Sequence, residues 1–97
     1  MANIRISPDT MRGRANEFRN ESSKIGDSIS SMDRLLGQLQ EEWEGEASRS
    51  YAERYNSELK PSFQKAQQMV DEIAQALDKT AQEMQDMDQR IASGFRG

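Results

Sequence analysis

The chain has 97 residues, of which 34% are hydrophobic and 31% charged, and its net charge is −4. Such a composition suits one soluble domain with a thin core, and the many Glu, Gln, Ala, Arg, Lys and Met indicate an all-α fold, because these residues lose little freedom in a helix. The negative charge argues against nucleic acid as a partner, since coating it needs a basic face. Cys and His are absent, which removes the commonest metal ligands and general base, so we expect no enzyme, no metal site and no cofactor.

The N-terminal segment carries no apolar stretch of the kind found in secretory signal peptides, and no window of about 18 residues is apolar enough to span a bilayer. We therefore expect neither a cleavable signal peptide nor stable membrane insertion.

The first predicted helix covers about residues 8–42. Ser7, Pro8 and Asp9 form a start signal: a capping hydroxyl, a proline at the first helical position and a carboxylate at the positive end of the helix dipole. From Met11 to Trp43, apolar or small residues recur at alternating spacings of 4 and 3, which is a heptad seam. The seam residues that we expect to form the core or a dimer contact are Phe18, Ile25, Ile29, Met32, Leu36 and Leu39.

The second predicted helix covers about residues 47–93, and its seam includes Val70, Ile73 and Leu77. The alternation of spacings breaks once, at residues 55, 59 and 63, beside Pro61. This pattern predicts a bend near residues 57–61 within a continuous helix. Gly94 predicts a left-handed helix stop followed by a short tail, residues 94–97.

A short turn at residues 43–45 between two long helices predicts a single antiparallel helix-turn-helix hairpin. Small residues on both seams would allow close approach of the helices, and further residues widen the apolar face of the second helix beyond what one partner covers. We therefore predict that two copies pair as a four-helix bundle. The small seam residues are Ala15, Ser22 and Ala66, and the flanking residues are Met69, Ala74, Ala76 and Ala81.

The turn itself, Trp43-Glu44-Gly45, has two interpretations. In the first, the Trp43 ring caps the end of the core, its N–H donates to a turn carbonyl or to water, and Gly45 reverses the chain with a positive φ. In the second, the same turn also displays a recognition surface. The glutamates around it, and the acidic cluster at residues 83–88, are expected to be solvated helix faces, because carboxylates on straight helices diverge.

A Trp-X-Gly turn at the middle of a Cys-free chain of this length, flanked by heptads, resembles the WXG100 (ESAT-6-like) family of type VII secretion substrates. The resemblance covers almost the whole chain. Many family members carry an export-linked pattern in the second helix, which falls here on Met84, Asp88, Ile91 and Phe95. In the alternative interpretation these residues have structural roles only: Met84 and Ile91 belong to the seam, Asp88 is a solvated charge at its edge, and Phe95 covers the end of the helix. Because the chain lacks the Tyr-X3-acid signal of the mycobacterial branch, it is more similar to the homodimeric members from Firmicutes.

The resemblance implies a non-enzymatic protein that is cytoplasmic before export and is then secreted without a cleavable signal peptide, as a virulence-associated or co-secretion factor. Its expected partners are a second copy of itself, the FtsK/SpoIIIE-like membrane ATPase of the secretion system, and other WXG proteins or toxins. A cytoplasmic helical adaptor that is never exported is the alternative. An amphipathic membrane binder fits less well, because 17 acidic residues outnumber 13 basic ones.

Overall fold

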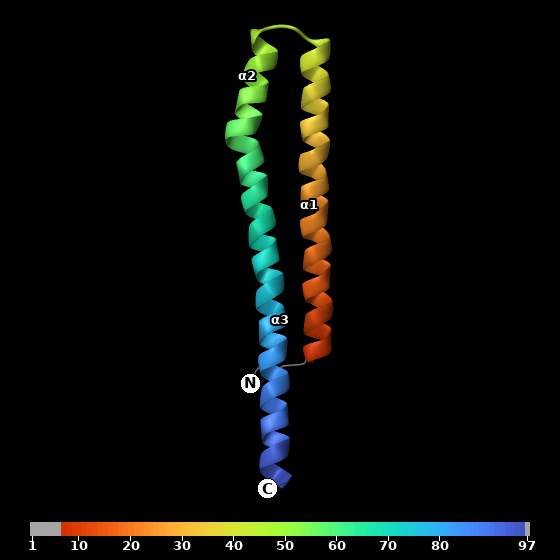
Figure 1. The fold of residues 1–97 in the computed structure, drawn as a ribbon, viewed down its shortest axis with the longest axis vertical. Helices are drawn as coiled ribbons and strands as arrows, with labels where there is room; N and C mark the ends of the chain where they lie inside the picture. Colours follow the sequence, from red (N-terminus) through yellow and green to blue (C-terminus); the bar gives the residue numbers. More distant parts are fainter. Residues whose placement is uncertain (1–6, 97) are drawn as a thin grey trace, which may run out of the picture.

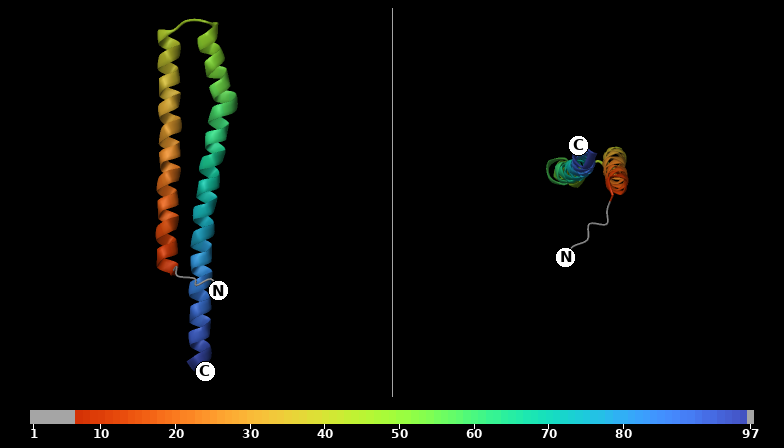
Figure 2. Two further views of the ribbon diagram at one scale, coloured as in Figure 1. Left: turned by 180° about the vertical axis from the view of Figure 1, so that it is seen from behind. Right: turned by 90° about the horizontal axis from the view of Figure 1, so that it is seen from below.

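The computed structural model describes residues 7–96, with side chains as far as Gly94, and shows two long helical arms folded against each other (Figure 1). The first arm is α1 (Pro8–Glu42), and the second runs without interruption through α2 (Glu46–Arg54), the π-helical turn η1 (Tyr55–Leu59) and α3 (Lys60–Arg96). No strand occurs between residues 7 and 96. The antiparallel hairpin measures 76 × 24 × 17 Å, so its shape is a rod two helices wide (Figure 2).

The start of α1 is the predicted cap. The Ser7 hydroxyl oxygen accepts a hydrogen bond from the Thr10 amide at 3.1 Å, and Pro8 and Asp9 occupy the first turn. At the other end the Trp43 amide donates to the Leu39 carbonyl at 2.9 Å. These contacts satisfy backbone groups that a helix terminus leaves without intrahelical partners.

The irregularity predicted near residues 57–61 is the π-helical turn η1, where the second arm bows outward (Figures 1 and 2). The Lys60 amide donates to the carbonyl of Tyr55, five residues back. Pro61 follows directly, and a wider turn relieves the clash between its ring and the carbonyl four residues earlier. The Ser57 and Ser62 hydroxyls donate to the carbonyls of Glu53 at 2.7 Å and Glu58 at 2.8 Å.

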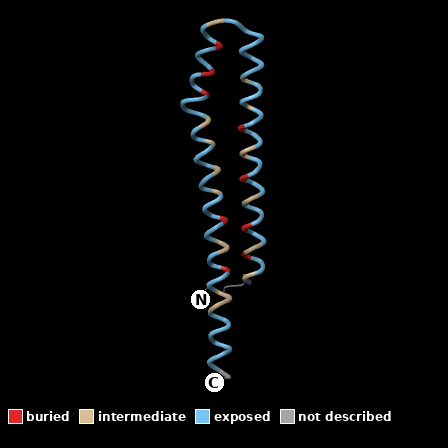
Figure 3. The backbone as a smooth tube through the Cα atoms, in the orientation of Figure 1, coloured by how far each residue is buried: buried red, intermediate tan, exposed pale blue. Residues whose placement is uncertain are grey.

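The buried residues form a narrow line along the facing sides of the two arms (Figure 3), which we call the inner stripe. Most of its side chains are small, so the two helices lie close together and bury little apolar area. Ala74 and Ala81, predicted to flank the seam, are at its centre with 0% exposure, whereas Ala66, predicted to permit close approach, is exposed. The inner stripe consists of Met11, Ala15, Ser22 and Ile29 on α1, and of Ser48, Ala52, Tyr55, Ala74 and Ala81 on the second arm.

One edge of the hairpin is closed by polar contacts between the arms, which we call the polar edge. Arg12 donates to Gln85 at 2.6 Å, Arg19 pairs with Asp78, and Lys60 pairs with Asp33 at 3.0 Å. Their α1 members, at positions 12, 19 and 33, recur at multiples of seven residues and so share one face of the helix. The polar edge therefore fixes the register of the two arms.

The last turns of α3 extend past the start of α1 and form an overhang (Figure 1). Arg12 on the second turn of α1 already contacts Gln85, and α3 continues to Arg96. The predicted helix stop at Gly94 is wrong: no described glycine has a left-handed φ, and the helix passes through this residue. Glycine weakens a helix without forbidding the right-handed conformation, and nothing within 4 Å of Gly94 constrains it.

Candidate interaction surfaces

The hairpin tip presents Trp43, a residue that is 42% exposed. The ring contacts Tyr51 on α2, with centroids 6.1 Å apart and planes inclined at 47°. The prediction that the ring caps the end of the hairpin core is therefore wrong for a single chain, because the inner stripe ends at small side chains and only one aromatic neighbour lies against the indole. The tip carries an aromatic pair that is open to a partner.

The prediction that Gly45 reverses the chain in the left-handed conformation is wrong. Its φ of 164° and ψ of 166° are those of an extended residue, and its carbonyl accepts a hydrogen bond from the Arg49 amide at 3.3 Å. A Cβ at this position would meet only the Trp43 Nε1 atom, at 3.8 Å, an ordinary van der Waals distance. The turn is crossed by extended backbone, so the hairpin fold does not require glycine here.

Glutamates surround this tip, and all of them are exposed. Within residues 7–96 no group of three or more acidic side chains is arranged to hold a metal ion. No helix in that range is long and apolar enough to cross a bilayer. The tip is therefore an aromatic pair ringed by carboxylates, namely those of Glu41, Glu42, Glu44 and Glu46.

A broad line of apolar side chains lies beside the inner stripe, on the side opposite the polar edge. At one end Trp43, directly after α1, contacts Tyr51 on α2. Further along, Ile25 and Met32 of α1 share a hollow of about 620 Å³ with Phe63 of α3, so both arms contribute to the same side. We call this surface the apolar face. It consists of Phe18, Ile25, Met32, Leu36 and Leu39 on α1, of Trp43 directly after α1, and of Tyr51, Leu59, Phe63, Val70, Ile73 and Leu77 on the second arm.

The seam residues predicted from the sequence divide between these two surfaces. Ile29 is buried in the hairpin, and Ile25, Met32, Leu36, Val70 and Leu77 are half-buried. Phe18, Leu39 and Ile73 remain 37%, 37% and 44% exposed, so one chain alone does not cover them. Their burial by a second copy stays a prediction.

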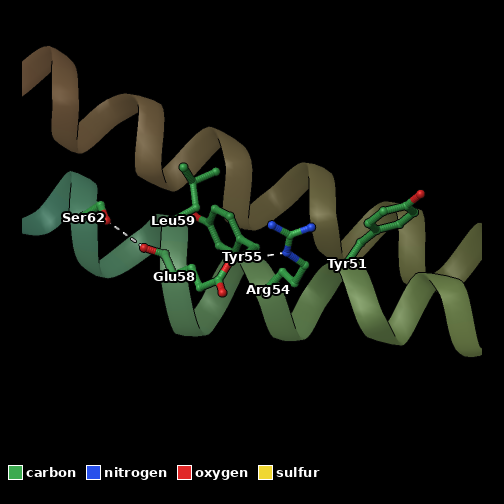
Figure 4. Close-up of a pocket in the computed structure, with 6 residues that line it drawn as sticks. All are labelled: Tyr51, Arg54, Tyr55, Glu58, Leu59 and Ser62. Carbon is green, nitrogen blue, oxygen red and sulfur yellow. Dashed lines mark hydrogen bonds and ion pairs between the residues drawn. The ribbon is translucent and has the colours of Figure 1, made fainter.

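The apolar face is hollowed at η1 by a pocket of about 440 Å³ (Figure 4). All of its lining side chains come from successive turns of the second arm. Tyr55 forms the floor beside Leu59, which is 45% exposed, and Arg54 pairs with Glu58 at 3.3 Å on the rim. The six lining residues are Tyr51, Arg54, Tyr55, Glu58, Leu59 and Ser62.

Tyr55 also joins this pocket to a polar junction between the arms. Its hydroxyl donates to the Asp33 carboxylate at 2.8 Å and lies 3.3 Å from the Ile29 carbonyl, while Lys60 donates to the other Asp33 oxygen at 3.0 Å. The hydrogen bonds from Tyr55 and then Lys60 lower the pKa of Asp33, because both stabilise its charged form. Burial and the Asp33 carboxylate raise the pKa of Tyr55.

The residues of the export-linked pattern start beside α1 and continue into the overhang. Met84 is half-buried, whereas Asp88 is exposed and Ile91 is 53% exposed. Their spacing of four and three residues places these three side chains on one face of α3. The Phe95 side chain lies outside the described residues.

The sequence interpretation missed the polar junction and the polar edge. The available signal was the recurrence of Arg12, Arg19, Gly26 and Asp33 at seven-residue spacing directly beside the seam. A cross-helix partner for each cannot be identified from one helix alone, because the pairing depends on the register of the other arm.

The family profile described as "WXG100: Proteins of 100 residues with WXG" matches residues 3–89. The chain belongs to the WXG100 family. Trp43 and Gly45 are the Trp and Gly of the motif in its name. The similarity is spread over the whole chain, since the protein YukE of Bacillus subtilis is 34% identical over 94 residues, covering 97% of this chain and 96% of YukE.

A second WXG100 relative is the type VII secretion system extracellular protein A of Staphylococcus aureus, 32% identical over 95 residues, covering 98% of this chain and 97% of that protein. Among solved structures, EsxA of Geobacillus thermodenitrificans has a TM-score of 0.83 at 37% identity and covers 95% of this chain and 100% of its own. The secreted protein EsxB of Bacillus anthracis has a TM-score of 0.81 at 20% identity, covering 91% and 99%, and supports the hairpin fold alone.

Proposed function

We propose that this WXG100 protein is a non-enzymatic substrate of a type VII secretion system, which leaves the cytoplasm without a cleavable signal peptide. The observation that carries the proposal is similarity over nearly the whole chain to a staphylococcal protein named as a type VII secretion system extracellular protein. The site supports an interaction role, because its prominent features are exposed apolar and aromatic side chains on rigid helices.

The proposed exported form is a homodimer in which two hairpins pair through their apolar faces as a four-helix bundle. The inner stripe is made mostly of small residues, so the hairpin buries little apolar area of its own, and the large side chains lie on the opposite side from the polar edge. A two-fold pairing covers the same surface on both copies. Sedimentation at micromolar concentration should then give twice the chain mass of 11.1 kDa.

The proposed contact for the secretion ATPase, an FtsK/SpoIIIE-like enzyme, is the overhang. Met84, Asp88 and Ile91 share one face of α3, which runs from the level of the start of α1 into the overhang, and Phe95 continues the spacing. An isolated helix end of this kind resembles the amphipathic helices that dock into grooves by residues at i, i+4 and i+7. Trp43 and Gly45 are the second candidate contact.

Export is tested in the native host by immunoblotting the culture supernatant with and without the secretion ATPase. The wild-type protein should disappear from the supernatant when the ATPase gene is deleted, and Asp88→Ala should accumulate in the cells. Glu72→Ala, an exposed carboxylate on the same helix, is the matched control and should be exported normally. Unchanged extracellular levels without the ATPase would rule out this route, whereas a wild-type protein that is absent from the supernatant would favour the cytoplasmic adaptor.

A role after export is the next step of the proposal: a virulence-associated factor, or a partner that accompanies other WXG proteins or toxins. Affinity purification of the exported protein from the supernatant should recover such proteins if it is a co-secretion factor. Recovery of the homodimer alone would contradict co-secretion.

A further inference from the structure

The π-helical turn η1 is not needed to keep the second arm against α1. The buried or half-buried positions of this arm that face α1 run from Ala52 to Lys60 in eight residues, and afterwards to Gln67, Ala74 and Ala81 in sevens. The π-turn absorbs the one extra residue, so the inner stripe keeps its phase on both sides. A chain one residue shorter here would keep the same phase as a regular α-helix.

The extra residue does change the outer surface. It widens the helix where the apolar pocket opens, and it places Leu59 beside Tyr55 on the apolar face (Figure 4). Tyr55 is held by Asp33 at 2.8 Å, so the floor of the pocket is fixed. The extra residue is not required by the packing of the hairpin, and it creates a hollow with a fixed floor that is open to a group from outside the chain.

The geometry points to the π-turn pocket as the site that receives an apolar side chain from a second copy of this chain. Two features favour a second copy. The pocket is continuous with the apolar face through Tyr51, which contacts Trp43. The rim of the pocket carries one charge of each sign, on Arg54 and Glu58. The rim is therefore self-complementary in a two-fold pairing, and it favours neither an acidic nor a basic partner. This inference rests on the proposed homodimer, and it names η1 as its specificity-determining element.

The test is the dimer dissociation constant of the full chain, measured by sedimentation equilibrium or by a fluorescence-labelled dilution series. Leu59→Ser removes the exposed wall of the pocket and should weaken the dimer by about tenfold or more, the effect of losing one buried apolar side chain. Asn56→Ala is the matched control, because Asn56 lies in the same turn but lines a groove on the opposite side with Gln40 and Ser57. It should leave the dissociation constant within about twofold.

A second variant removes the π-turn itself. Deletion of Asn56 combined with Pro61→Ala gives seven-residue spacing throughout and restores the amide that proline lacks. It should keep full helicity by circular dichroism and the Tyr55 contact with Asp33, while the dimer weakens by about tenfold or more. Pro61→Ala alone keeps the extra residue and should dimerise like the wild type.

The outcomes separate the two proposals. If Leu59→Ser and the deletion variant weaken the dimer no more than Asn56→Ala does, the pocket inference is overturned and the homodimer still stands. A wild-type chain that stays monomeric at high micromolar concentration would overturn both. If the deletion variant loses helicity, the phase argument is wrong, and Leu59→Ser still decides the role of the pocket.

Discussion

The close packing of the two arms makes Ala74→Leu the sharpest test of the hairpin core. Ala74 is completely buried at the centre of the inner stripe, where a larger side chain must separate the helices or leave its preferred rotamer. Overpacking of this kind costs about 1–3 kcal/mol. Leucine and alanine have similar helix propensities, so little of the change would arise from the helix itself.

The matched control is Ala47→Leu, which makes the same substitution at an exposed position on the polar side of α2. Thermal unfolding followed by circular dichroism at two protein concentrations separates hairpin stability from dimer linkage. For a chain of this size each kcal/mol lowers the melting temperature by about 4–8 °C. If Ala74→Leu has the same melting temperature as Ala47→Leu and the wild type, the two arms do not approach through the inner stripe, and the assignment of the core is wrong.

The remaining predictions concern charge and glycine. Because the folded pKa of Asp33 is lowered, its contribution to stability is present above the unfolded value of about 4 and is lost as the pH falls through the lower folded value. The melting-temperature difference between wild type and Asp33→Asn should therefore shrink below about pH 4; a difference that is independent of pH would contradict the hydrogen bond from Tyr55. Gly13→Ala and Gly37→Ala, at helical positions with nothing within 4 Å of the added Cβ, should each raise the free energy of unfolding by about 0.5–1 kcal/mol in urea titrations. Gly45→Ala should leave hairpin stability within about 0.5 kcal/mol but reduce export in the supernatant assay, and a strongly destabilised hairpin would show that the fold does need this glycine.

The sequence by itself determined the local structure of this protein. The cap at Ser7, the seam ending at Trp43 and the broken spacing around Pro61 are encoded in neighbouring residues, because capping, heptad spacing and proline geometry act within one or two helical turns. The structure accordingly has α1 at Pro8–Glu42 and the irregular turn at Tyr55–Leu59. The same local signals, with the Trp-X-Gly motif, indicated the WXG100 family.

The tertiary structure decided which half of each apolar stripe faces the other arm. The apolar stripe of a heptad seam is wide enough to pack against two helices, and the periodicity of the sequence does not indicate which of the two helices belongs to the same chain. The close contact falls on Ala74 and Ala81, and large side chains such as Ile73 are left exposed. Only the register set by Arg12, Arg19 and Asp33 against the second arm fixes this choice, because those contacts join residues 27 to 73 positions apart in the sequence.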